Sequence, residues 1–264
     1  MVQRVVVQIL ARVMARLEVP DNISLGAARA DIAATGANTV ADFNHFYRSR
    51  AAGEEKAEIS CDGAHCIALR QIAWPLNGNT ALACATQISA IGMVDTGINA
   101  NHDVLSGQKI ELLQLSMPGE QKSGLQHGTA VAALLIGREN TRTPGLLPDA
   151  ELVAVDVFHR SGGDERADIF SIVHAFDTLQ QRGIKLVNMS LAGPPNALLE
   201  TMTDELSNNG VIIVAAAGNE GPNAAPAFPA AYPSVVAVTA IDASGGIYIA
   251  APTKAGISTL PLPA

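Results

Sequence analysis

From residue 88 onward, short apolar stretches alternate with longer stretches of helical character. Six stretches are apolar along nearly their whole length: 88–94, 109–115, 151–158, 184–190, 211–217 and 234–241. Helices are expected between several of them, at 127–138, 165–182 and 196–209. Strands that are apolar throughout are buried on both faces, as in a parallel sheet covered by helices on both sides. The sequence therefore predicts an α/β fold, a doubly wound and mainly parallel sheet with helices on both faces.

Residues 1–85 lack this alternation and predict a mostly helical or irregular N-terminal segment ahead of a domain at 86–264. Apolar side chains recur at helical spacing over 2–18, with arginines opposite them, which predicts an amphipathic helix there and a second helix at 24–36. The first 18 residues do not form an intact signal peptide. Arg12 and Arg16 interrupt their apolar region, and no small-residue cleavage site closes it.

The overall charge limits the classes of partner. The 264 residues carry a formal net charge of −8, which argues against nucleic acid or an anionic membrane surface as the main partner. No uninterrupted apolar run approaches the ~18 residues of a membrane-spanning helix, so no span is expected.

Two of the three cysteines lie close together, in the stretch CDGAHC. A local disulfide between Cys61 and Cys66 is the favoured interpretation, with two free thiols as an alternative. Metal binding by these cysteines and His65 is disfavoured, because a structural zinc site needs four ligands and no second pair is visible. No metal site is therefore predicted. Cys84 is expected to be a small core residue.

Three polar residues occupy positions suited to catalysis. The apolar run IGMV ends in Asp95, and Thr-Gly follows at once. His127 opens a predicted helix in QHGTAVAALLIG, where a carboxylate could fix its tautomer and leave one ring nitrogen as a general base. Asn219 follows a buried strand in VIIVAAAGNEGP, and its amide could donate to a developing oxyanion. An aspartic-protease interpretation of D-T-G would need a second such aspartate, and the sequence has none.

Four motifs in order, VDTG, HGTAVA, VNMSLAG and AAAGNEGP, resemble those of the subtilisin family of serine peptidases, over roughly residues 86–252. The resemblance implies that Asp95 orients His127, that His127 is the general base and that Asn219 donates to the oxyanion. It implies that Ser190, Leu191, Ala192 and Gly193 pair with an extended polypeptide substrate, and that Ala215, Ala216, Ala217 and Gly218 line the substrate pocket. It also implies a secreted or periplasmic protein. No cofactor is expected, although calcium is common in this family.

The nucleophile of the resembled family lies in a G-T-S-x-A-x-P-like stretch that opens a helix, and the sequence has no such stretch. The serines after Asn219 are Ser234, Ser244 and Ser258, and none has this context. The expectation is a subtilisin-like serine endopeptidase that lacks its C-terminal serine helix. A non-catalytic peptide-binding protein on the same scaffold is one alternative, and a serine segment supplied by another chain is a second.

Overall fold

The computed structural model describes residues 3–49, 88–115, 119–139, 141, 143–221 and 223–241. Its main sheet has six strands in the order β13-β12-β10-β4-β7-β5, and every neighbouring pair is parallel. These strands are β4 (Ala90–Asp95), β5 (Ile110–Gln114), β7 (Glu151–Asp156), β10 (Leu186–Met189), β12 (Ile212–Ala216) and β13 (Val236–Val238). Each of the six apolar stretches holds one strand of this sheet, so the predicted strand set is confirmed. The predictions for Cys61, Cys66 and Cys84 lie outside the described residues.

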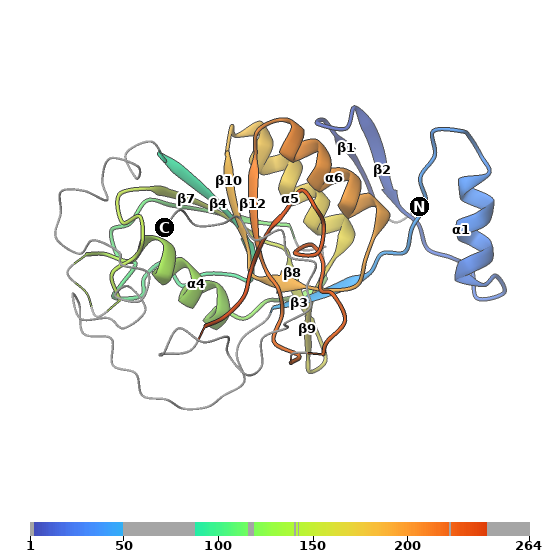
Figure 1. Ribbon diagram of the computed structural model, residues 1–264. Helices are drawn as coiled ribbons and strands as arrows, with labels where there is room; N and C mark the ends of the chain where they lie inside the picture. Colours follow the sequence, from blue (N-terminus) through green and yellow to red (C-terminus); the bar gives the residue numbers. More distant parts are fainter. Residues whose placement is uncertain are drawn as a thin grey trace.

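Helices cover both faces of the sheet (Figure 1), which confirms the doubly wound α/β fold. On one face lies α4 (Gln126–Ile136), and on the other lie α5 (Ile169–Gln181) and α6 (Ala197–Asn208). Side chains alternate between these layers along each strand. In β4, Met93 belongs to the apolar cluster under α4, whereas the next residue, Val94, belongs to the cluster under α5 and α6. A strand buried on both faces must be apolar at nearly every position, and for this reason an unbroken apolar stretch predicts such a strand.

A second sheet has five strands in the order β11-β3-β9-β8-β6, with antiparallel pairing throughout. They are β11 (Leu191–Ala192), β3 (Phe46–Ser49), β9 (Asp164–Asp168), β8 (Phe158–Ser161) and β6 (Gln121–Lys122). The helix predicted to start at residue 165 therefore starts later, at Ile169. Asp168 ends β9 and caps α5, since its Oδ1 accepts the Ser171 N–H at 2.8 Å.

The helix predicted over residues 2–18 is wrong. This segment forms an antiparallel hairpin of β1 (Gln3–Val7) and β2 (Arg12–Arg16), and α1 (Leu25–Ala33) is the one helix among the described residues before Ser49. The valines of this stretch are β-branched, which favours strand over helix. Val7 and Met14 are buried while Val6 and Val13 point outward, a period of two rather than 3.6. In so short a segment, the same apolar residues fit both the helical period of 3.6 and the strand period of two.

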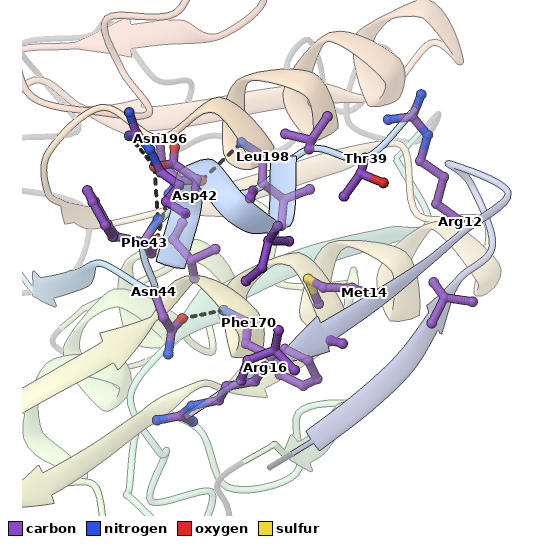
Figure 2. A pocket seen from close by; sticks show the side chains of 18 of the residues that line it. Arg12, Met14, Arg16, Thr39, Asp42, Phe43, Asn44, Phe170, Asn196 and Leu198 are labelled. Atoms are coloured by element: carbon purple, nitrogen blue, oxygen red, sulfur yellow. Dashed lines mark hydrogen bonds and ion pairs between the residues drawn. The ribbon is translucent and has the colours of Figure 1, made fainter. Parts of the chain in front are cut away.

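The N-terminal segment is joined to the α5 and α6 layer. The Ile9 N–H donates to Asp177 Oδ1 of α5 at 3.0 Å, and Arg16 bonds Asp168 Oδ2 at 2.9 Å. A cavity of about 560 Å³ lies between β2, α1, the 38–44 stretch and the starts of α5 and α6 (Figure 2). In the described part of the chain, no helix has the length and apolar character needed to cross a membrane.

Candidate active site

Asp95 and His127 meet at the carboxyl end of β4. Asp95 is the last residue of the strand and is 1% exposed, and its Oδ1 lies 2.6 Å from His127 Nδ1. Because a carboxylate accepts hydrogen bonds, Nδ1 carries the proton and Nε2 is left as the nitrogen that can take one. Asp95 Oδ1 also accepts the Thr96 N–H at 2.7 Å. Oδ2 is buried without a hydrogen-bond partner among the described residues, so the bonds described for this carboxylate are all at Oδ1.

The turn after Asp95 brings α4 unusually close to the sheet. The Gly128 N–H donates to Thr96 Oγ1 at 2.9 Å, one residue after His127 in the helix. A Cβ on Gly128 would lie 2.5 Å from the Thr96 carbonyl oxygen and 2.6 Å from that of Gly97. Glycine is therefore required at this position, and its absence of a side chain lets His127 reach Asp95.

A second buried carboxylate supports the same turn. Asp156 ends β7 and lies opposite Asp95 in the sheet. Its Oδ2 accepts a hydrogen bond from Ser123 Oγ at 2.8 Å, and Ser123 Oγ in turn accepts the Gly97 N–H at 2.9 Å. Sequence reasoning missed Asp156 and Ser123. The available signal was the apolar stretch ELVAV ending in aspartate, the same pattern that marked Asp95.

Burial and charge shift the pKa values of two of these groups. Burial alone would lower the pKa of His127, but its hydrogen bond to Asp95, the charge of Asp95 and the charge of Glu165 together raise it. Burial raises the pKa of Asp156 to about 6, and the charges of Glu165 and Asp95 add to the rise. The hydrogen bonds that Asp156 accepts act in the opposite direction and are outweighed.

The edge predicted to pair with substrate already has partners in the chain itself. Leu191 and Ala192 form β11, which pairs with Ser49 and Arg48 of β3. Gly193 exchanges two backbone hydrogen bonds with Phe228, at 2.9 and 3.0 Å. Ser190, just before β11, accepts a hydrogen bond from Asn188 Nδ2 at 3.0 Å. This edge is thus completed by an extended segment of the N-terminal part of the chain, which the sequence did not reveal.

Asn219 follows β12, two strands from β4 in the sheet. Because the sheet is parallel, the carboxyl ends of β4, β10 and β12 lie on the same side of it. Asp95 ends β4 there, and Ser190 and Asn219 follow β10 and β12 on that side. Gly218 makes the turn with φ of +105°, a conformation that favours glycine. Of the three alanines, Ala215 and Ala217 are buried at 2% and 3% exposure, whereas Ala216 is partly exposed.

Glu120, His159 and Asp168 offer ligand atoms that all lie within 4.8 Å of one another, the one such group found among the described residues. Asp168 is already engaged by the Arg16 guanidinium and by the Ser171 N–H. A cation at this group would have to displace the Arg16 guanidinium from Asp168. We therefore do not include these three residues in the candidate active site.

The chain was compared with known proteins. The family model described as the Subtilase family matches residues 87–257. Subtilisin DY of Bacillus licheniformis is 33% identical over 162 residues, which cover 58% of this chain and 57% of that protein. Subtilisin BL of Lederbergia lenta is 35% identical over 156 residues, covering 58% and 55%.

Solved structures give the same result. The self-cleaved protease domain of PatA is similar with a TM-score of 0.54 and 26% identity, over 63% of this chain and 62% of that one. The psychrophilic subtilisin-like protease Apa1 from an Antarctic Pseudoalteromonas has a TM-score of 0.50 and 27% identity, over 64% and 41%. The chain spans little more than half the length of subtilisins DY and BL. The family model covers more than half of the chain, so the chain belongs to the Subtilase family.

Proposed function

We propose that this chain carries the acid–base and oxyanion groups of a serine endopeptidase. In this proposal His127 Nε2 is the general base, Asp95 holds the imidazole and stabilises its protonated form, and Asn219 donates to the oxyanion. The observation that carries the proposal is the 2.6 Å hydrogen bond between Asp95 and His127 at the carboxyl end of a parallel strand. That edge of an open α/β sheet is where such folds place their sites.

The substrate in this proposal is an extended polypeptide. Ser190, Leu191, Ala192 and Gly193 would hold its backbone as a strand in the place that β3 and Phe228 occupy. Ala216 and Gly218 are exposed enough to touch its side chains. The proposed chemistry uses no cofactor. A secreted or periplasmic location remains a prediction from the sequence.

We further propose that the nucleophile is not among the described residues. Ser234 lies before the amino end of β13, whereas Asp95 lies at the carboxyl end of β4 in the same parallel sheet. The Ser234 hydroxyl donates to Thr203 Oγ1 at 3.1 Å. The Ser123 hydroxyl donates a hydrogen bond to Asp156. Ser244 and Ser258 lie outside the described residues. In subtilisin, loss of the nucleophile lowers turnover by a factor of ~10⁶.

A fluorophosphonate, which labels only activated serines, tests the proposal when intact mass is measured before and after incubation. We expect no adduct from the folded chain. A single adduct that disappears in His127→Ala would contradict the missing nucleophile and identify a serine that His127 activates. The Asp95–His127 bond is checked separately by the low-field proton resonance of Nδ1–H, which should be absent in Asp95→Ala. Without that resonance in the unmodified chain, the peptidase proposal fails.

A non-catalytic peptide-binding protein is the second candidate function. The pairing of β11 with an extended segment favours it. An adduct that depends on His127 would exclude this second candidate, because a non-catalytic binding protein gives no adduct under any condition.

A further inference from the structure

We propose that β3 is a resident copy of the peptide that this edge recognises, and that the recognised ligand is an extended polypeptide carrying tyrosine followed by arginine. The inference rests on the proposed function, since it takes the β11 edge to be the peptide-binding edge. To the proposed function it adds the chemical class of the ligand and the residues that recognise it.

The backbone of β3 lies where an added strand would lie. It pairs antiparallel with β9 on one side, with Tyr47 opposite Ala167, and with β11 on the other, with Arg48 opposite Ala192. Removing it would leave the facing edges of β9 and β11 open to any extended chain. β3 also comes from the N-terminal part of the sequence, far from both neighbours, and not from the domain that supplies them.

Tyr47 provides the deepest contact. Its side chain is 0% exposed, and its hydroxyl donates to the Pro194 carbonyl oxygen at 2.7 Å. A Cβ on Gly193 would lie 2.5 Å from the Tyr47 ring, so this glycine opens the space that the ring fills. Burial raises the pKa of Tyr47, which keeps the hydroxyl protonated and therefore a donor. A phenylalanine would fill the same space but would leave the Pro194 carbonyl without this bond.

Arg48 provides charge selectivity on the outer face. Its Nε and Nη2 donate to the two carboxylate oxygens of Asp164 at 3.0 and 2.9 Å, a bidentate pairing that a lysine does not reproduce. The hydrogen bond from Arg48 lowers the pKa of Asp164, so the carboxylate is ionised at neutral pH. The pair is half exposed, so it contributes little to the stability of the fold. Its role in the proposal is to favour an arginine over other side chains at this position of the ligand.

The stretch before β3 is also held like a bound ligand (Figure 2). Asp42 Oδ2 accepts the Ala197 N–H at 2.8 Å, at the start of α6, where the helix dipole favours a carboxylate. Asn44 Oδ1 accepts the Phe170 N–H at 3.1 Å, at the start of α5. Residues 42–45 thus contact the starts of two helices around a tight turn, in which the His45 N–H donates to the Phe43 carbonyl oxygen at 2.9 Å, and the extended residues 46–49 pair with two strand edges.

The probe is a fluorescently labelled peptide with the sequence of residues 42–49, DFNHFYRS, and the readout is fluorescence anisotropy. Its host is the full chain carrying Tyr47→Ala, which weakens the resident strand. The unmodified chain should bind no probe at micromolar concentration, because its own β3 competes at an effective concentration of roughly millimolar or more. The Tyr47→Ala host should bind it saturably. A probe with Ala in place of Tyr should bind at least roughly a hundredfold more weakly.

Two further substitutions in the host test whether Gly193 and Asp164 recognise the ligand. Gly193→Ala in the Tyr47→Ala host should abolish binding, since the new Cβ fills the space of the ring. Asp164→Arg in that host should reverse the preference between the probe and a version with Glu in place of Arg, each preference being roughly three- to tenfold. Circular dichroism must show that every host is folded. If Tyr47→Ala does not fold, Arg48→Glu takes its place, because that side chain is half exposed and like charge with Asp164 weakens the resident strand.

The proposal is overturned if a folded host binds no probe at millimolar concentration, since β3 is then a permanent strand. It is equally overturned if binding survives Gly193→Ala, since the probe then lies elsewhere. The low-field resonance of His127 is recorded on the same samples. Failed probe binding with an intact resonance refutes the ligand class alone, whereas loss of the resonance in the unmodified chain refutes the proposed function.

Discussion

At the scale of single residues, Asp95 controls the proton affinity of His127. In the variant Asp95→Asn we expect the pKa of His127 to fall from above its ordinary value to below it. The burial that lowers the pKa remains, while the charge of Asp95 and the hydrogen bond to a charged acceptor are lost, and only the charge of Glu165 still raises the pKa. The pH titration of the His127 Cε1–H signal by NMR measures this change, and an unchanged titration would contradict it.

The same pKa shift contributes to stability. A histidine whose pKa is raised in the folded state stabilises the fold fully below its unfolded pKa of about 6.5, and this contribution is lost as pH rises through the higher folded value. Asp95→Asn should therefore lose stability mainly on the acidic side of that window. Urea unfolding of both chains across the range measures the difference.

Asp156 gives a pH dependence of stability with the same sign, at lower pH. Its pKa rises from 3.8 to about 6 on folding, so the unmodified chain should lose stability between about pH 4 and pH 6, as the buried carboxyl ionises. Asp156→Asn should remove this loss, which amounts to roughly 2–3 kcal/mol at neutral pH. Urea unfolding at several pH values is the measurement. Parallel pH profiles for the two chains would show that ionisation of Asp156 does not carry the effect.

At the scale of elements, the contact between α4 and the turn after β4 depends on Gly128. Gly128→Ala places a Cβ against two backbone carbonyls, which cannot move away as a side chain would. We expect a loss of about 1–3 kcal/mol in the free energy of unfolding, together with weakening of the His127 low-field resonance. Gly26→Ala in α1 is the matched control. Its Cβ would meet nothing within 4 Å, so the substitution should be neutral or slightly stabilising.

Elements also show where sequence reasoning succeeds and fails. The strands β4, β7, β10 and β12 were predicted because burial on both faces requires an unbroken apolar run. The β1–β2 hairpin was mistaken for a helix because it is short and half exposed, so that two periods fit the same residues. Strand β3 carries no local signal, since its pairing partners lie more than a hundred residues away.

At the scale of the whole molecule, Arg16 links the β1–β2 hairpin to the start of α5. Its partner Asp168 is 1% exposed, so Arg16→Ala removes a charge partner from a buried carboxylate. We expect faster amide hydrogen exchange in Gln3–Val7, with the six-stranded sheet unaffected. Arg4→Ala, at an exposed position on the neighbouring strand, is the control and should leave exchange unchanged. Equal effects of the two substitutions would show that the ion pair does not hold the hairpin.

The sequence by itself determined the sheet class, the strand set and the pairing of Asp95 with His127. These features depend on local patterns, namely unbroken apolar runs and polar residues at strand ends, and parallel strands bring such ends to one edge. Only the tertiary structure decided that β3 fills the edge beside Ser190 and that Asp156 lies next to Asp95. Both depend on contacts between segments distant in the chain, and their side chains show no pattern until packing brings them together.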